Sequence, residues 1–234
     1  MTDYTFKGQL KTSGDNSEHV NSISALEDKF SSGIFRSPSD RYFIELSCQY
    51  LEKESVILLQ TYNETYRRLF KNNMLMDSAL SIEMDEIDFS LVISPLAKIL
   101  ETELNFSIVQ WFRAQVGVPM PQYYHEDMRD WVPTAEQENE YRYIDVNFKN
   151  KSMTIGTTIR LLRHYDAKKT LPGPLAKHTG FIDACDRLRE ARNIAAHSGY
   201  ADRNAFEGSF SAFSELKDRG VFASLAEIKE AIRQ

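Results

Sequence analysis

Three polar residues close together in the chain have the types and the spacing to move a proton and bind a phosphate. They are Arg192, Asn193 and His197, within the segment FIDACDRLREARNIAAHSGY. A histidine titrates at about pH 6.5 and can take or give a proton near neutrality. A guanidinium can bind a phosphate and offset the charge that develops on it. Because residues four positions apart share one face of a helix, Asn193 can hydrogen-bond the imidazole of His197 and orient it.

The segment that carries these residues, 181–197, has the pattern of a helix closed by Gly199. At about 100° per residue, one stripe faces the core. Its members are Phe181, Ala184, Cys185, Leu188, Ala191 and Ala195. Asn193 and His197 fall on the face away from this stripe, whereas Arg192 falls beside it. Arg192 can therefore meet His197 in two ways: its long side chain reaches around the helix, which loosens at its end, or a second copy of the chain completes the site.

The remaining pattern predicts an all-α fold, a helical bundle with one irregular insertion. Helical periodicity runs for about 30 residues after Asp40 without Gly or Pro. Further helices are expected at 22–30, 89–116, 154–165, 204–217 and 224–233. We expect an N-terminal arm over 1–37 and one helical domain over 38–234. An irregular insertion at about 117–152 interrupts the domain, and its alternating residues 141–148 can form a short β-hairpin.

Composition and charge describe a globular chain with an uneven charge distribution. The chain has 234 residues, of which 42% are hydrophobic and 26% charged, which excludes wholesale disorder. The net charge of −6 alone argues against nucleic-acid binding. However, 77–145 holds 14 acidic and 4 basic residues, a net of −10, whereas 160–203 holds 9 basic and 5 acidic residues, a net of +4. A polyanion would therefore be attracted to the later segment and repelled by the middle one.

Several classes of protein are excluded by what the sequence lacks. No apolar run approaches the roughly 18–20 residues that a membrane-spanning helix needs. The polar N-terminal residues lack the apolar stretch of a secretory signal, so we expect a cytoplasmic protein. Cys48 and Cys185 lie far apart and outside any CxxC pair, which argues against a disulfide scaffold or a zinc ribbon. We expect two reduced thiols that pack as small hydrophobic groups.

No other residues form a convincing site. His164, His178 and Asp166 lack the spacing of metal ligands, and no glycine-rich phosphate loop is present. Glu101 and Glu103 lie on different faces of a predicted helix, so packing or surface roles are expected for each. We therefore expect neither a metal nor a cofactor.

The segment from Arg192 to His197, of the form R-N-x-x-x-H, resembles the R-x4-6-H signature of HEPN domains. A polar residue commonly follows the arginine in that family. The context is similar too: ISPLAKILETEL, residues 93–104, resembles the earlier long helix of the family. The segment from Met153 to Gly156 resembles the start of the helix before the signature. The resemblance covers roughly 39–217, and the chain departs from a minimal HEPN domain in its N-terminal arm and its insertion.

The resemblance implies a metal-independent endoribonuclease that acts as a homodimer on RNA. The 2′-hydroxyl of the RNA would attack the adjacent phosphate and leave a 2′,3′-cyclic phosphate. His197 would shuttle the proton, Arg192 would hold the phosphate and its developing charge, and Asn193 would orient the histidine. HEPN domains commonly act in phage defence or in toxin–antitoxin systems, so a regulatory or antitoxin protein is a further expected partner.

A second interpretation is a non-catalytic HEPN-like module that binds a nucleotide, RNA or a partner protein and regulates that partner. The acidic segment 77–145 favours it, because such a surface suits protein binding more than RNA binding. In that case Arg192 can simply form an ion pair with Glu190 or Asp186. His197 is then a residue favoured at the end of a helix by the helix dipole.

Overall fold

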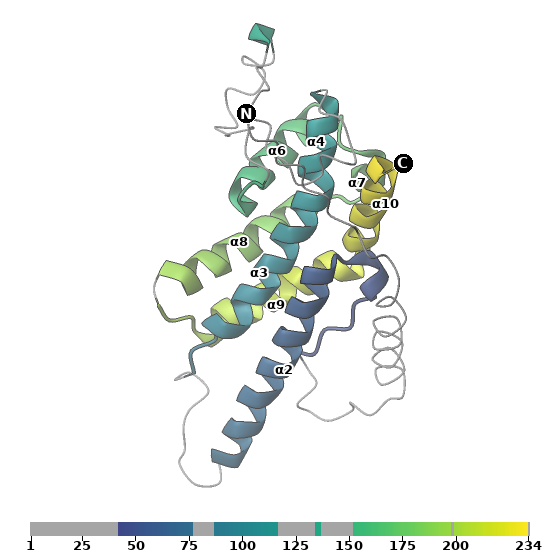
Figure 1. Cartoon of the computed structure of the whole chain (residues 1–234). Helices are drawn as coiled ribbons and strands as arrows, with labels where there is room; N and C mark the ends of the chain where they lie inside the picture. Colours follow the sequence, from purple (N-terminus) through teal and green to yellow (C-terminus); the bar gives the residue numbers. More distant parts are fainter. Residues whose placement is uncertain (1–41, 77–86, 117–133, 137–151, 198, 234) are drawn as a thin grey trace, which may run out of the picture. The chain divides into compact units, whose positions relative to one another are not determined.

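The computed structural model of the chain describes residues 42–76, 87–116, 134–136, 152–197 and 199–233 (Figure 1). The chain divides into two compact units, Met1–Asp40 and Arg41–Gln234, and every described residue belongs to the second. The predicted arm, the helix at 22–30, the hairpin at 141–148 and nearly all of the 117–152 insertion lie outside the described residues.

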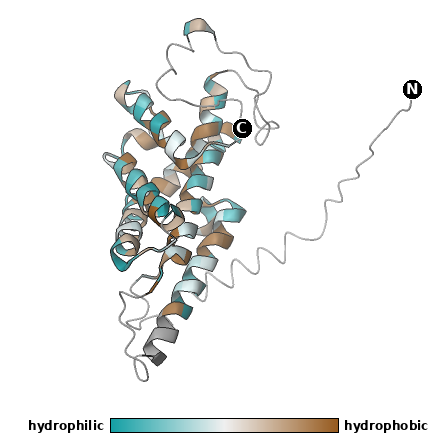
Figure 2. Cartoon of the chain, turned by 90° about the vertical axis from the view of Figure 1, so that its left-hand side faces the viewer, coloured by the Kyte–Doolittle hydropathy of each residue, from teal (hydrophilic) through white to brown (hydrophobic). Residues whose placement is uncertain are grey.

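The described residues form helices and no strands, which confirms the predicted all-α class. The short elements are the 3-10 helix η2 (Cys48–Tyr50), the π-helix η4 (Asn105–Val109) and α7 (Gly173–Ala176). The others are α2 (Lys53–Met76), α3 (Ser90–Leu104), α4 (Gln110–Gln115), α6 (Ile155–Ala167), α8 (Phe181–His197), α9 (Arg203–Asp218) and α10 (Val221–Arg233). Hydrophobic and hydrophilic residues are interleaved along them (Figure 2), and none of the described helices has the length and apolar character to span a membrane.

The helix predicted to begin near Asp40 begins later, at Lys53, so its predicted start was wrong. Asn63 of α2 explains the difference, because its side chain accepts from the backbone N–H of Ile44 (3.1 Å) and donates to the Ile44 carbonyl (3.0 Å). The Tyr62 hydroxyl likewise donates to the carbonyl of Tyr42 (2.7 Å). These bonds satisfy backbone groups that a helix would otherwise pair, and Ile44 is buried. The apolar residues before Lys53 therefore pack on α2 as a non-helical segment.

The helix predicted over 89–116 is present but contains a π-helical turn, η4. At the start of this turn the Asn105 side chain accepts from the Met153 N–H (2.7 Å) and donates to the Met153 carbonyl (2.9 Å). Next to Met153, the Thr154 hydroxyl caps α6 by accepting from the Thr157 N–H (3.3 Å). Single π turns often occur where a helix must present a polar side chain. Here the π turn fixes the start of α6 against the long helix.

Helix α8 occupies the residues predicted for it and packs against α3, α6 and α9. The six residues of the predicted core stripe are all buried, which confirms the orientation of the helix. Cys185 is one of them, and burial raises the pKa of its thiol to about 12. Cys48 is half-buried and forms no disulfide within the described residues. The faces predicted for Asn193 and His197 point away from this core.

The chain that leaves α8 returns to the start of α3. The N–H of Phe89 donates to the carbonyl of Ala201 (2.9 Å), and the N–H of Ala201 donates to the Asp88 carboxylate (3.0 Å). The same carboxylate accepts from the hydroxyl (2.6 Å) and the N–H (2.9 Å) of Ser90. Desolvation raises the pKa of Asp88, but these three hydrogen bonds outweigh it and lower that pKa below its ordinary value. Asp88 therefore ties the segment between α8 and α9 to the N-terminal end of α3.

A buried ion cluster holds α10 on α3. The Lys229 ammonium lies 2.6 Å from the Glu103 carboxylate and 3.0 Å from that of Glu52, and it donates to the Tyr50 carbonyl (3.0 Å). Glu103 also accepts from the N–H of Glu52 (2.8 Å). Glu103 and Lys229 are buried, which a folded chain tolerates because each charge has partners. Glu103 thus has a packing role, one of the two roles expected for it.

Candidate functional site

The three residues of the predicted site lie on the outer face of α8. Arg192 and His197 are exposed, and Asn193 is half-buried. The Arg192 guanidinium donates a long hydrogen bond to the side-chain oxygen of Asn193 (3.4 Å). Within the described residues, no hydrogen bond joins Asn193 to His197. In a single chain, Asn193 therefore forms a hydrogen bond with the arginine and not with the histidine that it was predicted to orient.

Arg192 does not form the ion pair with Asp186 or Glu190 that the second interpretation offered. Arg189 lies 2.7 Å from Asp186 and 3.4 Å from Glu190. Arg163 of α6 lies 2.5 Å from the other oxygen of Asp186. Both carboxylates are thus engaged by other arginines. Among the residues that the structure describes, Arg192 has no carboxylate partner, and its positive charge stays available to an anion.

A groove runs beside Arg192, between α8 and α3, and has a volume of about 520 Å³. Arg192 and Ala196 line it from α8, Leu58 from α2 and Ile155 from α6. The α3 side consists of Ser90, Leu91, Ser94, Pro95, Ala97, Lys98 and Glu101. We call this the α3–α8 groove. Its volume lies in the usual range for small-molecule sites, about 300–1,000 Å³.

Gly156, in the first turn of α6, faces the Arg189 side chain of α8. A Cβ atom at this position would lie 3.4 Å from Cδ of Arg189, at the short end of ordinary contact. A larger side chain would push against Arg189, which is held by Asp186. The resemblance singled out Gly156 from its sequence context, and the structure places this glycine beside the Arg189 side chain of α8. Ile155, its neighbour in the chain, lines the α3–α8 groove.

His197 is the last residue of α8 and does not line the α3–α8 groove. Arg192 and His197 therefore lie on one helix, one to two turns apart, and of the two only Arg192 lines this groove. A histidine at this place is favoured by the helix dipole when it carries a proton. The sequence left two ways for Arg192 to meet His197: its side chain reaches around the helix, or a second copy of the chain completes the site. In the single chain, the Arg192 side chain does not reach around the helix to His197.

The other histidine and carboxylate candidates form no metal site in the described part of the chain, where no three His, Cys, Asp or Glu side chains cluster. His178 instead shares a hydrogen bond with the hydroxyl of buried Ser224 on α10 (2.8 Å). Burial lowers the pKa of His178, as do the positive charges of Lys177 and Arg219, against a smaller opposite effect of Glu227. His178 therefore links the segment before α8 to α10.

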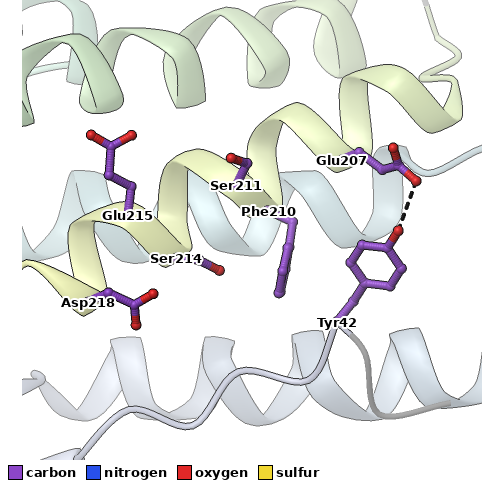
Figure 3. A pocket seen from close by; sticks show the side chains of 7 residues that line it. All are labelled: Tyr42, Glu207, Phe210, Ser211, Ser214, Glu215 and Asp218. Carbon is purple, nitrogen blue, oxygen red and sulfur yellow. Dashed lines mark hydrogen bonds between the residues drawn. The ribbon is translucent and has the colours of Figure 1, made fainter. Parts of the chain in front are cut away.

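A second groove, which the sequence did not indicate, lies along α9 and has a volume of about 490 Å³ (Figure 3). We call it the α9 groove; it is lined by Tyr42, Glu207, Phe210, Ser211, Ser214, Glu215 and Asp218. Glu207 accepts from the Tyr42 hydroxyl (2.8 Å), as Figure 3 shows, and from Arg203 (2.9 Å). Asp218 lies 3.1 Å from the Lys217 ammonium. These carboxylates are therefore compensated within the chain.

Sequence reasoning found Arg192 but missed the groove that it lines. The groove residues come from four helices, and no short motif joins them. The one available signal was Leu91, an apolar residue at the start of a predicted helix, which proves to be 66% exposed. Comparison of the chain with protein-family models, with curated proteins and with solved structures gave no match.

Proposed function

We propose that the chain is a metal-independent endoribonuclease of the HEPN type. The observation that carries the proposal is Arg192, an exposed guanidinium without a carboxylate partner among the described residues, at the rim of a groove. His197 is exposed on the same helix, where an imidazole can exchange protons with a bound substrate. Together with the resemblance of the R-N-x-x-x-H segment, this arrangement favours phosphate chemistry on RNA.

The reaction needs one proton removed and one supplied. The 2′-hydroxyl oxygen of the RNA forms a bond to the adjacent phosphorus and loses its proton to a base. The bond from phosphorus to O5′ breaks, and O5′ takes a proton from an acid, which leaves a 2′,3′-cyclic phosphate. His197 serves as base or acid, and Arg192 binds the non-bridging oxygens as charge develops on them. Asn193 positions Arg192 through their hydrogen bond. DNA lacks the 2′-hydroxyl and is not cleaved.

A homodimer supplies both proton-transfer groups in this proposal. One imidazole cannot be base and acid in the same step, so a second copy of the chain contributes the second His197. Two large apolar side chains on and just after α8 support an interface there, since Ile194 is 49% and Tyr200 is 41% exposed. By the same resemblance, the proposed role is in phage defence or a toxin–antitoxin system, with a regulatory or antitoxin protein as partner.

The second candidate is a module that binds a nucleotide or RNA without cutting it. It is favoured by the surroundings of His197, which makes no hydrogen bond within the described residues. Catalytic histidines commonly owe their orientation to such a bond. In this case Arg192 and the α3–α8 groove would still bind a phosphate-bearing ligand, and His197 would be dispensable.

The two candidates are separated by cleavage of end-labelled tRNA and mRNA in EDTA. Wild-type protein is compared with Arg192→Ala, His197→Ala and the control Arg187→Ala, an exposed arginine of α8 that pairs with Glu215. Cleavage by wild type and the control alone, with 2′,3′-cyclic phosphate ends, supports the ribonuclease. RNA binding without cleavage, lost only in Arg192→Ala, supports the second candidate. Cleavage that survives both site substitutions would overturn the site.

A further inference from the structure

The α3–α8 groove contains a matched donor and acceptor one turn apart on α3. The Lys98 ammonium lies 2.7 Å from Oε1 of Glu101, and both side chains line the groove together with Arg192. The Glu101 side chain is 19% exposed, so its carboxylate is held in place while still reachable. Its second oxygen has no hydrogen-bond partner among the described residues. The groove therefore offers an acceptor-only group and a donor-only group side by side.

The other walls of the groove are largely apolar. Leu58, Leu91, Pro95 and Ile155 contribute aliphatic surface from three helices, and Leu91 is 66% exposed. Aliphatic surface beside these charged groups favours a ligand with a flat apolar face. Arg192 at the rim favours a phosphate on the same ligand. A planar heterocycle joined to a phosphate, as in a nucleotide, combines these features.

We propose that the α3–α8 groove binds the guanine base of a nucleotide whose 3′-phosphate contacts Arg192. The Watson–Crick edge of guanine carries two adjacent donors, N1–H and the N2 amino group, beside one acceptor, O6. A carboxylate accepts from both donors at once, and an ammonium donates to O6. Adenine, cytosine and uracil each present one donor group on this edge, so they make one hydrogen bond to the carboxylate where guanine makes two. Glu101 and Lys98 thus select guanine.

This inference rests on the proposed function in one respect: the phosphate at Arg192 is the one that is cleaved. Under that function the enzyme prefers to cut on the 3′ side of guanosine in single-stranded RNA, where bases are free to leave the stack. The groove itself is independent of cleavage, because a free nucleotide bears the same base and phosphate. Binding and cleavage can therefore be tested separately.

The test is equilibrium binding of 3′-GMP, 3′-AMP, 3′-CMP and 3′-UMP to the full chain in EDTA. These monophosphates have no bond to cleave, so the measurement does not depend on catalysis. We expect 3′-GMP to bind about tenfold more tightly than the other three nucleotides, because guanine gains one more charge-assisted hydrogen bond. Glu101→Gln removes that preference. Arg192→Ala weakens all four 3′-nucleotides by a similar factor and leaves the binding of unphosphorylated guanosine unchanged.

Matched controls separate base selection from general effects of charge. Glu64→Gln neutralises an exposed carboxylate of α2 that pairs with Arg67 and Arg68 away from the groove, and it leaves the guanine preference intact. Thermal unfolding of Glu101→Gln is compared with that of wild type, because Glu101 pairs only with exposed Lys98 within the described residues. Equal binding of the four nucleotides, no binding of any, or an unchanged preference in Glu101→Gln would overturn the inference.

The failures of the two proposals are distinguishable. Selective binding of 3′-GMP by a chain that cleaves no RNA would keep the guanine site and overturn the ribonuclease. Cleavage of RNA that depends on Arg192 and His197 but shows no preference for guanosine would keep the ribonuclease and overturn the guanine site.

Discussion

The α3–α8 groove and the α9 groove have similar volumes, about 520 and 490 Å³. They differ in whether their charged side chains have partners of opposite charge. In the α9 groove, Glu215 pairs with Arg187 and lies 2.8 Å from Arg219, and the other two carboxylates have partners as well. In the α3–α8 groove, Arg192 has no carboxylate partner among the described residues. A groove whose charges are compensated internally offers little to a charged ligand, whereas an uncompensated cation keeps its attraction for a phosphate.

The largest expected effect comes from removing the uncompensated cation. Arg192→Ala should lower kcat/KM for RNA cleavage by about 10²–10³-fold, the usual loss for a group that stabilises developing charge. Arg187→Ala, on the same helix but paired with Glu215, should change kcat/KM by about twofold or less. Initial rates on a labelled single-stranded RNA measure both. Equal losses in the two variants would remove the distinction between the grooves.

A smaller effect should follow from compensating Arg192 without removing it. Ala196 lies four residues after Arg192 and lines the same groove, so Ala196→Glu places a carboxylate at ion-pair spacing. We expect about a tenfold loss of affinity for 3′-GMP, because the new carboxylate both forms an ion pair with the guanidinium and repels the phosphate. Ala196→Gln, of the same size and uncharged, should lose much less. Isothermal titration calorimetry compares the two, and equal losses would point to steric blockage.

The α9 groove should respond in stability alone. Glu215→Gln removes the partner of Arg187 and Arg219. Because these pairs are at the surface, the free energy of unfolding should fall by about 1 kcal/mol or less. Urea unfolding measures it, and RNA cleavage should be unchanged. A gain of RNA binding in this variant would show that any arginine of α8 without a carboxylate partner is enough to bind RNA.

The smallest effect is a pH dependence at Asp88, which accepts hydrogen bonds from Ser90, a residue that lines the α3–α8 groove. The pKa of Asp88 is lowered in the folded chain, so its stabilising contribution is present above an unfolded pKa of about 3.9 and is lost as pH falls through the folded pKa. In Asp88→Asn the free energy of unfolding should depend less steeply on pH in this acidic range. Urea unfolding at a series of pH values tests this. An identical slope in wild type and variant would contradict the assigned role of the hydrogen bonds to Ser90 and Ala201.

The sequence predicted those features that depend on local periodicity. The bounds of α8 and six of its seven buried residues were predicted because the helical repeat is regular over 181–197. The start of α2 was missed because Ile44 is held by Asn63, nineteen residues later. The lack of a carboxylate partner for Arg192 among the described residues could not be predicted either. It depends on Arg163, from another helix, which engages Asp186. The function of the site stays a prediction.

The buried cluster of Lys229 with Glu103 also bears on the order of events during synthesis. Glu103 leaves the ribosome long before Lys229, and a carboxylate buried without its cation costs several kcal/mol. Helix α3, which forms one wall of the α3–α8 groove, therefore reaches its final packing only after α10 has been translated and has docked on it.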